Sequence, residues 1–172
     1  MRVGPKCINS ALMTFLQQMT EWLGPRRLFW AMRFYPPYLG AGIRVRNIDP
    51  SLRFIEVEMP LRPWTRNYVG TQFGGSLYSM CDPFFMLLVM MRLGPAYIVW
   101  DKSAQIDFLK PGRGAVRARF DVSEDQLKRI KDGVEREGKV NPVFEVTVAD
   151  LEGIPIARVT KTLSVRRRNR ES

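Results

Sequence analysis

Along the first 42 residues, apolar side chains recur every three to four positions, which is the period of an amphipathic helix. The pattern predicts one helix over residues 8–23 and a second, opened by a proline, over residues 26–35. Prolines and glycines between residues 36 and 42 then break the chain. We therefore expect residues 1–41 to form a helical arm that packs onto the rest of the chain as one folding unit, rather than lying on a membrane.

From residue 43 onward the apolar period is mostly two, as in strands that bury one face. Strands are predicted over residues 43–46, 54–59, 97–109, 115–122, 143–149 and 154–166. Two helices interrupt them. One is almost wholly apolar and covers residues 75–93, and the other is charged, covers residues 123–137 and has Ser123 as its cap.

The apolar helix decides the fold class, because a helix that is hydrophobic on nearly all sides has to be enclosed. An antiparallel sheet wrapped around it would enclose it, and a second subunit would cover what remains. This order of elements indicates an α+β protein with the hotdog fold. Residues 42–172 are then the hotdog domain, and the arm is its N-terminal helical extension.

The composition excludes several kinds of chemistry. The 172 residues suit one domain and include no histidine, so Ser-His-Asp and Cys-His catalytic pairs and histidine-ligated metals are excluded. Cys7 and Cys81 are far apart and form no redox or metal motif, which favours free thiols in a reducing compartment. The apolar run from Pro83 to Met91 is too short to span a bilayer, and the N-terminus lacks a secretory signal pattern. We expect a cytoplasmic protein with no transmembrane segment and no bound metal.

The charge balance points to anionic partners. The chain has 27 Lys and Arg against 17 Asp and Glu, a formal net charge of +10. This excess favours phosphorylated small molecules, lipid surfaces or nucleic acid. The basic cluster Arg166–Arg170 is the candidate for nucleic-acid contact, but no nucleic-acid-binding motif accompanies it. We expect a solvated, frayed tail and no nucleic acid partner.

The residues that are candidates for a catalytic or binding role lie between Asn67 and Pro83. Gly74 and Gly75 come directly before the apolar helix, where backbone N–H groups lack partners and a ligand can approach the main chain closely. Such a helix end is suited to polarising a carbonyl oxygen. Asp82 follows in an apolar segment, where a carboxylate has to be partnered or protonated. Asn67 offers an uncharged amide that could hold a water or a carbonyl group.

Each of these residues also has a purely structural interpretation. Asp82 precedes a proline and could cap a helix restarted at Pro83. The two glycines could serve a turn, and an asparagine in a polar loop is often a turn residue.

The spacing of Asn67, Gly74-Gly75 and Asp82 resembles that of the PaaI-like hotdog thioesterases, which have an Asn, a His-Gly-Gly and a helical acid at these intervals. The run from Gln105 to Gly112 is similar to the strand of that family that ends in Phe-Leu-Arg-Pro-Gly. The resemblance covers about residues 43–165. Further details look like the uncharacterised DUF4442-type branch, whose members are described as possible tetrameric acyl-CoA thioesterases.

The resemblance implies hydrolysis of an acyl-CoA thioester to free acid and CoA. Asp82 would be the nucleophile or general base, Gly74 the backbone donor to the thioester carbonyl, and Asn67 the amide that orients water or the carbonyl. Phe73 stands where the family has its histidine, so a role that needs an imidazole is absent here.

The resemblance also implies a substrate-binding set. Its members are Gln72, Phe73, Gly75, Gln105, Lys110 and Arg113. Gln105 matches the strand position near the acyl group, and Lys110 and Arg113 flank the turn near the CoA phosphates, although both are equally expected as solvated turn residues. Coenzyme A enters only as part of the substrate, with no other cofactor. The family is a homodimer or tetramer whose acid and polarising amide can come from different subunits. The alternative function is a non-catalytic acyl-CoA-binding or lipid-binding hotdog protein.

Overall fold

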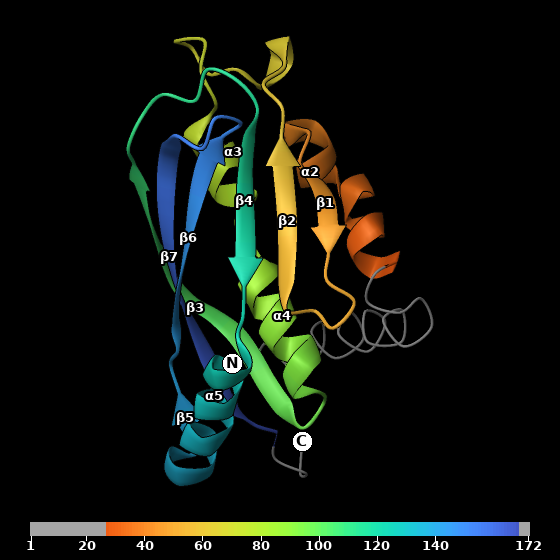
Figure 1. The fold of residues 1–172 in the computed structure, drawn as a ribbon, viewed down its shortest axis with the longest axis vertical. Helices are drawn as coiled ribbons and strands as arrows, with labels where there is room; N and C mark the ends of the chain where they lie inside the picture. Colours follow the sequence, from red (N-terminus) through yellow and green to blue (C-terminus); the bar gives the residue numbers. More distant parts are fainter. Residues whose placement is uncertain (1–26, 169–172) are drawn as a thin grey trace, which may run out of the picture.

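The computed structural model describes residues 27–168, and within them the strands form one antiparallel sheet (Figure 1). The strands are β1 (Arg44–Ile48), β2 (Phe54–Met59), β3 (Tyr97–Phe108), β4 (Val116–Asp121), β5 (Lys139–Val140), β6 (Val143–Asp150) and β7 (Pro155–Arg167). Their order is β1-β2-β4-β6-β7-β3, and the short β5 pairs with the far end of β7. The six predicted strands are confirmed to within two residues at each end, whereas β5 was not predicted.

The two faces of the sheet differ as the alternating pattern requires. Core-facing residues of the central strands are apolar, for example Val57 on β2 and Phe120 on β4. The opposite face carries cross-strand ion pairs, such as Arg117 with Glu58 at 2.9 Å. One face therefore covers a core, and the other meets solvent.

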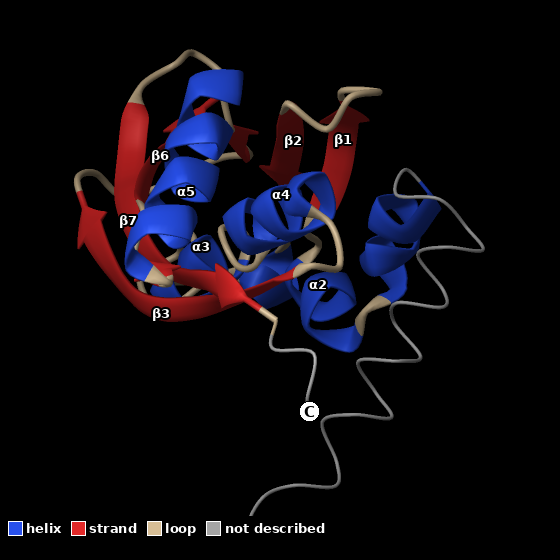
Figure 2. Cartoon of the chain, turned by 90° about the horizontal axis from the view of Figure 1, so that it is seen from below, coloured by secondary structure: helices blue, strands red, loops and turns tan. Residues whose placement is uncertain are grey.

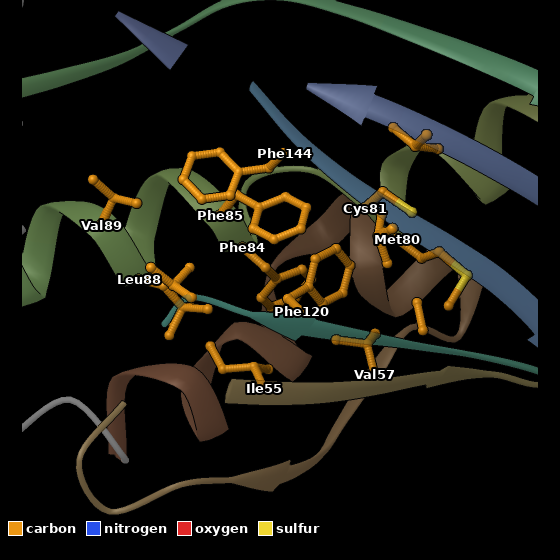
Figure 3. Close-up of a cluster of buried hydrophobic side chains, with 14 of the residues drawn as sticks. Ile55, Val57, Met80, Cys81, Phe84, Phe85, Leu88, Val89, Phe120 and Phe144 are labelled. Carbon is orange, nitrogen blue, oxygen red and sulfur yellow. The ribbon is translucent and has the colours of Figure 1, made fainter. Parts of the chain in front are cut away.

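The central helical segment lies inside the curve of the sheet, as Figure 2 shows. It consists of α3 (Gly74–Ser79) and α4 (Phe84–Leu93). Aromatic side chains lock it to the sheet: the ring centroids of Phe84 and Phe120 are 5.0 Å apart, and those of Phe85 and Phe144 are 4.9 Å apart (Figure 3). The predicted α+β hotdog fold, with its sheet wrapped around a central helix, is confirmed.

The central helix predicted over residues 75–93 is present, and it is interrupted at the place where a restart at Pro83 was the alternative. Residues 80–83 form a turn, so the axis is interrupted just where Asp82 lies. Within the described residues, Gly74–Leu93 is long and apolar enough to meet a length-and-composition test for a membrane span. Enclosed core helices meet the same test, and Phe84 and Leu88 on this segment are fully buried.

The charged helix α5 (Glu124–Glu137) packs beside β5 and β7. Ser123 caps it as predicted: its hydroxyl accepts from the Gln126 backbone N–H at 3.1 Å, and the Gln126 side chain accepts from the Ser123 N–H at 2.8 Å.

The arm is helical over residues 27–31, continues as a 3₁₀ turn, η1 (Met32–Phe34), and ends in α2 (Pro36–Ala41). The predicted second helix ends at Tyr35, whose backbone is extended, but Pro36 and Pro37 then open α2, because prolines at the first helical positions lose no intrahelical hydrogen bond. Phe29 and Tyr38 are buried in the core. The boundary between arm and domain at residue 41 stays a prediction. The predicted helix over residues 8–23 and the last four residues of the basic tail lie outside the described residues.

Candidate functional site

A groove of about 480 Å³ opens between the start of α3 and the loop that joins β3 to β4. It is lined by Asn67, Val69, Thr71, Gln72, Gly74, Leu77, Phe108, Leu109, Lys110, Pro111, Gly112 and Arg113. The structure thus brings together five of the predicted site residues, which lie up to 46 positions apart in the chain: Asn67, Gln72, Gly74, Lys110 and Arg113. Within residues 27–168, neither Lys110 nor Arg113 has an ion-pair partner.

Gly74 allows an aromatic ring to lie against the first turn of α3. A Cβ atom at this position would stand 2.9 Å from Cζ of Phe108, closer than an ordinary van der Waals contact. The Phe108 side chain is 58% exposed and forms one wall of the groove. Sequence reasoning did not single out Phe108, although a large aromatic at the exposed end of a strand was the available signal.

Both polar atoms of the Asn67 side chain form hydrogen bonds within its own loop. Its Oδ1 accepts from the backbone N–H groups of Val69 at 3.1 Å and Thr71 at 2.9 Å. Its Nδ2 donates to Thr71 Oγ1 at 2.9 Å and to the Gln72 carbonyl at 3.3 Å. This geometry is that of the turn-forming alternative, and the water-orienting role of Asn67 stays a prediction.

Gln72 forms hydrogen bonds to the end of β2 and to the loop that joins β3 to β4. Its Nε2 donates to the carbonyls of Met59 at 3.3 Å and Gly114 at 3.0 Å, while its backbone N–H donates to the Gly112 carbonyl at 2.8 Å. Its Oε1 is buried and has no hydrogen-bond partner among the described residues. Gln72 therefore fixes the position of the basic loop, whatever else it contacts.

The remaining predicted binding residues lie outside the groove lining. Phe73 is exposed, and its ring lies so close to Gly75 that a Cβ there would stand 2.5 Å from ring atom Cε1. Gln105 is exposed on β3 and donates from Nε2 to Asp107 Oδ1 at 3.1 Å. The structure does not bring these three residues to the groove, and their contact with a substrate stays a prediction.

Asp82 lies in the turn between α3 and α4 and is paired with Lys161 of β7. The Lys161 ammonium also lies 3.0 Å from Oδ2 of Asp101 on β3. The Lys161 side chain is fully buried, whereas those of Asp82 and Asp101 are 44% and 26% exposed. In this structure the Asp82 carboxylate does not cap α4, whose N-cap position is taken by Pro83 without a side-chain hydrogen bond.

Burial and charge act in opposite directions within this cluster. Burial disfavours the charged form of Lys161, but the hydrogen bonds and attraction of the two carboxylates outweigh it, so its pKa is raised. The pKa of Asp101 is also raised, chiefly by burial, with the negative charge of Asp82 adding to the effect and Lys161 opposing it. The lysine is therefore held as an ammonium ion between two carboxyl groups.

The neighbours of the cluster are uncharged. The Tyr38 hydroxyl donates to the backbone carbonyl of Asp82, and its pKa is raised by burial and by the Asp82 charge. Burial raises the pKa of the Cys81 thiol to about 12, which excludes it as a thiolate nucleophile near neutral pH. The Tyr78 ring lies 5.7 Å from the Lys161 ammonium. Across residues 27–168, no group of acidic, cysteine or histidine side chains could hold a metal ion.

Sequence reasoning found Asp82 but missed Lys161 and Asp101. The available signal was the period-two pattern: Lys161 stands between Val159 and Leu163 on the core-facing side of β7, and Asp101 follows Val99 on the same side of β3. Asp82 is not among the residues that line the groove at Gly74, so a single chain does not bring these two predicted catalytic groups into one cavity.

Comparison with known proteins places the chain in a family. The family described as "Domain of unknown function (DUF4442)" matches residues 24–165, and no curated protein matches the sequence. A probable thioesterase of unknown function from Pseudomonas aeruginosa superposes with a TM-score of 0.75 at 17% identity, over 84% of this chain and 97% of its own. The PaaI protein of the phenylacetic acid degradation operon of E. coli gives a TM-score of 0.57 at 19% identity, over 86% of this chain and 96% of its own. A thioesterase from Haemophilus influenzae gives a TM-score of 0.57 at 18% identity, over 78% of this chain and 85% of its own. These likenesses show the hotdog fold, and the family match shows that the chain belongs to the DUF4442 family.

Proposed function

We propose that the protein hydrolyses an acyl-CoA thioester to a free acid and CoA. The observation that carries the proposal is the carboxylate of Asp82, which is held on its buried side by Lys161 and left partly open to solvent on the other. Its pairing with Lys161 accounts for the buried side of this carboxylate, and the solvent-facing side is free to meet a substrate or a water. Similarity to proteins named thioesterases adds support at the level of reaction class.

The reaction needs a base and an oxyanion donor. Asp82 takes a proton from a water that attacks the thioester carbonyl, or attacks the carbonyl itself and is then released by water. The negative charge that develops on the carbonyl oxygen is stabilised by the Gly74 N–H at the start of α3. The C–S bond breaks, CoA leaves as a thiolate and takes up a proton, and the acid is released.

A second copy of the chain would complete this site. β3 is a 12-residue strand at one edge of the sheet, and within the described residues its outer side has no strand partner. Long open edges invite pairing with another chain, and Trp100 and Phe108 on β3 are exposed. In a homodimer, or a tetramer built from two dimers, Asp82 of one protomer would face the groove at Gly74 of the other.

The basic side chains at the rim of the groove fit the nucleotide end of CoA. Lys110 and Arg113 project from the loop that Gln72 anchors, on the same groove as Gly74. Phosphate groups favour Lys and Arg as donors. A cytoplasmic location, where acyl-CoA substrates occur, stays a prediction.

A thiol-release assay with short-chain, long-chain and aromatic acyl-CoAs tests the proposal. Wild-type protein should release CoA from at least one class, and Asp82→Asn should reduce the rate by at least about 100-fold. Asp132→Asn, an equivalent change on the exposed face of α5, is the matched control and should keep wild-type activity. Full activity in Asp82→Asn would overturn the assignment.

Non-catalytic binding of acyl-CoA is the second candidate, and two observations favour it. Phe73 replaces the histidine of the resembled family, and the Asn67 amide is fully engaged within its own loop. Calorimetric binding of acyl-CoA with no CoA release at high protein concentration would select this function over hydrolysis.

A further inference from the structure

Lys161 lies on the core-facing side of β7, where the neighbouring side chains on that side are apolar. It lies between Val159 and Leu163 on the core-facing side of the strand, and its side chain is fully buried. Burying an ammonium ion is costly unless opposite charges and hydrogen bonds compensate. A leucine or methionine would fill this core position without that cost. Packing alone therefore does not explain why a lysine stands here.

Two carboxyl groups from different elements supply the compensation. Asp82 comes from the turn after α3, Asp101 from β3, and both contact the same ammonium. The two are not equivalent. Asp101 is the more buried, and its Oδ1 is shut off from solvent and lacks a partner among the described residues, whereas Asp82 is the more exposed.

The charges of the cluster do not cancel. One ammonium between two ionised carboxylates leaves one negative charge in excess. Asp82 is the carboxylate that faces solvent, while Asp101 contacts the ammonium from the more buried side. The arrangement therefore holds the Asp82 carboxylate at the surface through its contact with a buried ammonium.

We infer that Lys161 is a positioning residue, whose buried ammonium holds the Asp82 carboxylate in place, with Asp101 anchoring the ammonium from the opposite side. The inference deepens the proposed hydrolysis and rests on it, but its electrostatic part can be measured without any turnover.

The other titratable groups packed around Lys161 stay uncharged near neutral pH. Tyr38 from α2, Tyr78 from α3 and Cys81 from the turn all have raised pKa values, chiefly through burial, so they stay protonated. The chain has no histidine. A change in the titration of Asp101 after substitution of Lys161 therefore reports the loss of the ammonium.

The first experiment measures CoA release for Lys161→Met, with the exposed Lys128→Met on α5 as the matched control. Lys161→Met should lower kcat by at least about tenfold with KM changed less than about threefold. Lys161→Arg, which keeps the positive charge, should recover most of the lost kcat.

Asp101→Asn guards against poor folding of Lys161→Met. It removes the inner anchor of the ammonium but leaves Lys161 paired with Asp82, so kcat should fall less than in Lys161→Met, with KM unchanged. Thermal unfolding of each variant shows which fraction is folded.

Carbon-detected NMR of labelled aspartate separates failure of this inference from failure of the proposed function. The titration midpoint of the Asp101 carboxyl carbon should rise in Lys161→Met and fall in Asp82→Asn, because Lys161 lowers the pKa of Asp101 and Asp82 raises it, whether or not the protein turns over. Unmoved midpoints in folded variants, or a rate loss equal to the unfolded fraction, would reduce Lys161 to a structural residue. Absent CoA release together with shifted midpoints would overturn the hydrolase proposal and leave the electrostatic inference standing.

Discussion

Substituting Gly74 by alanine tests whether the backbone at the start of α3 takes part in the reaction. The added Cβ would stand 2.9 and 3.1 Å from Cζ and Cε1 of Phe108. An ordinary carbon contact is about 3.5 Å or longer, so the ring has to retreat by about 0.5 Å or more. The ring is 58% exposed and can turn toward solvent, so this displacement costs little.

The expected effect on stability is therefore small. Gly74 is the first residue of α3, where alanine gains up to about 1 kcal/mol over glycine through the reduced entropy of the unfolded chain. That gain offsets most of the strain at Phe108. We expect the free energy of unfolding to change by less than about 1 kcal/mol.

The expected effect on activity is large. A methyl group and a displaced ring would stand where the thioester carbonyl has to approach the main-chain N–H, and a misplacement of about 1 Å costs about 100-fold in rate. We expect kcat/KM to fall by about 10-fold to 100-fold in a CoA-release assay, with partial recovery in Gly74→Ala/Phe108→Leu.

Gly40→Ala is the control, because no atom lies within 4 Å of a Cβ at that position. Unchanged kcat/KM in folded Gly74→Ala would refute the role of this backbone group, and a large loss of stability would refute the packing argument.

Three further predictions address the rest of the account. Changing Lys110 and Arg113 together to methionine should raise KM for acyl-CoA by about tenfold, because these side chains would bind the nucleotide phosphates. KM for the matching acyl-pantetheine, which lacks those phosphates, should be unchanged. Equal increases in KM for both substrates would show that neither residue binds the nucleotide. The Arg53 hydrogen bond lowers the pKa of Asp49 to about 2, so this carboxylate stabilises the fold above about pH 4 and its contribution is lost as pH falls toward 2. Asp49→Asn should lower the melting temperature at pH 7 and flatten its decline between those pH values, and an unaltered decline would contradict the assignment. Ser123→Ala should cost about 1 kcal/mol in urea unfolding through loss of the α5 cap, and a neutral result would contradict the capping geometry.

The sheet and its central helix could be predicted from the sequence, because the alternation of apolar and polar residues that indicates them involves only near neighbours in the chain. Alternation places Val57 and Phe120 on one face, and an apolar segment bounded by Gly74 and Gly94 has to be enclosed. One local detail was missed: after the helix end at Tyr35, Pro36 opens the further helix α2.

The charge cluster was not predicted because its members are far apart in sequence. Asp82 and Lys161 are separated by 79 positions, and only the pairing of β3 with β7 brings Asp101 to the same ammonium. A lysine at a core-facing position of a strand shows that an anion is near, but the local pattern does not say which one. The groove likewise depends on Gln72, whose long-range hydrogen bond to Gly114 no local pattern indicates.

Single-turnover mixing of excess protein with acyl-CoA in ¹⁸O-labelled water tests the central claim most directly. Wild-type protein should release one equivalent of CoA per bound acyl-CoA and place ¹⁸O in the free acid, whereas Asp82→Asn should bind the same amount and release essentially none. Stable binding without release by the wild-type protein, or release by Asp82→Asn at the wild-type rate, would contradict the account.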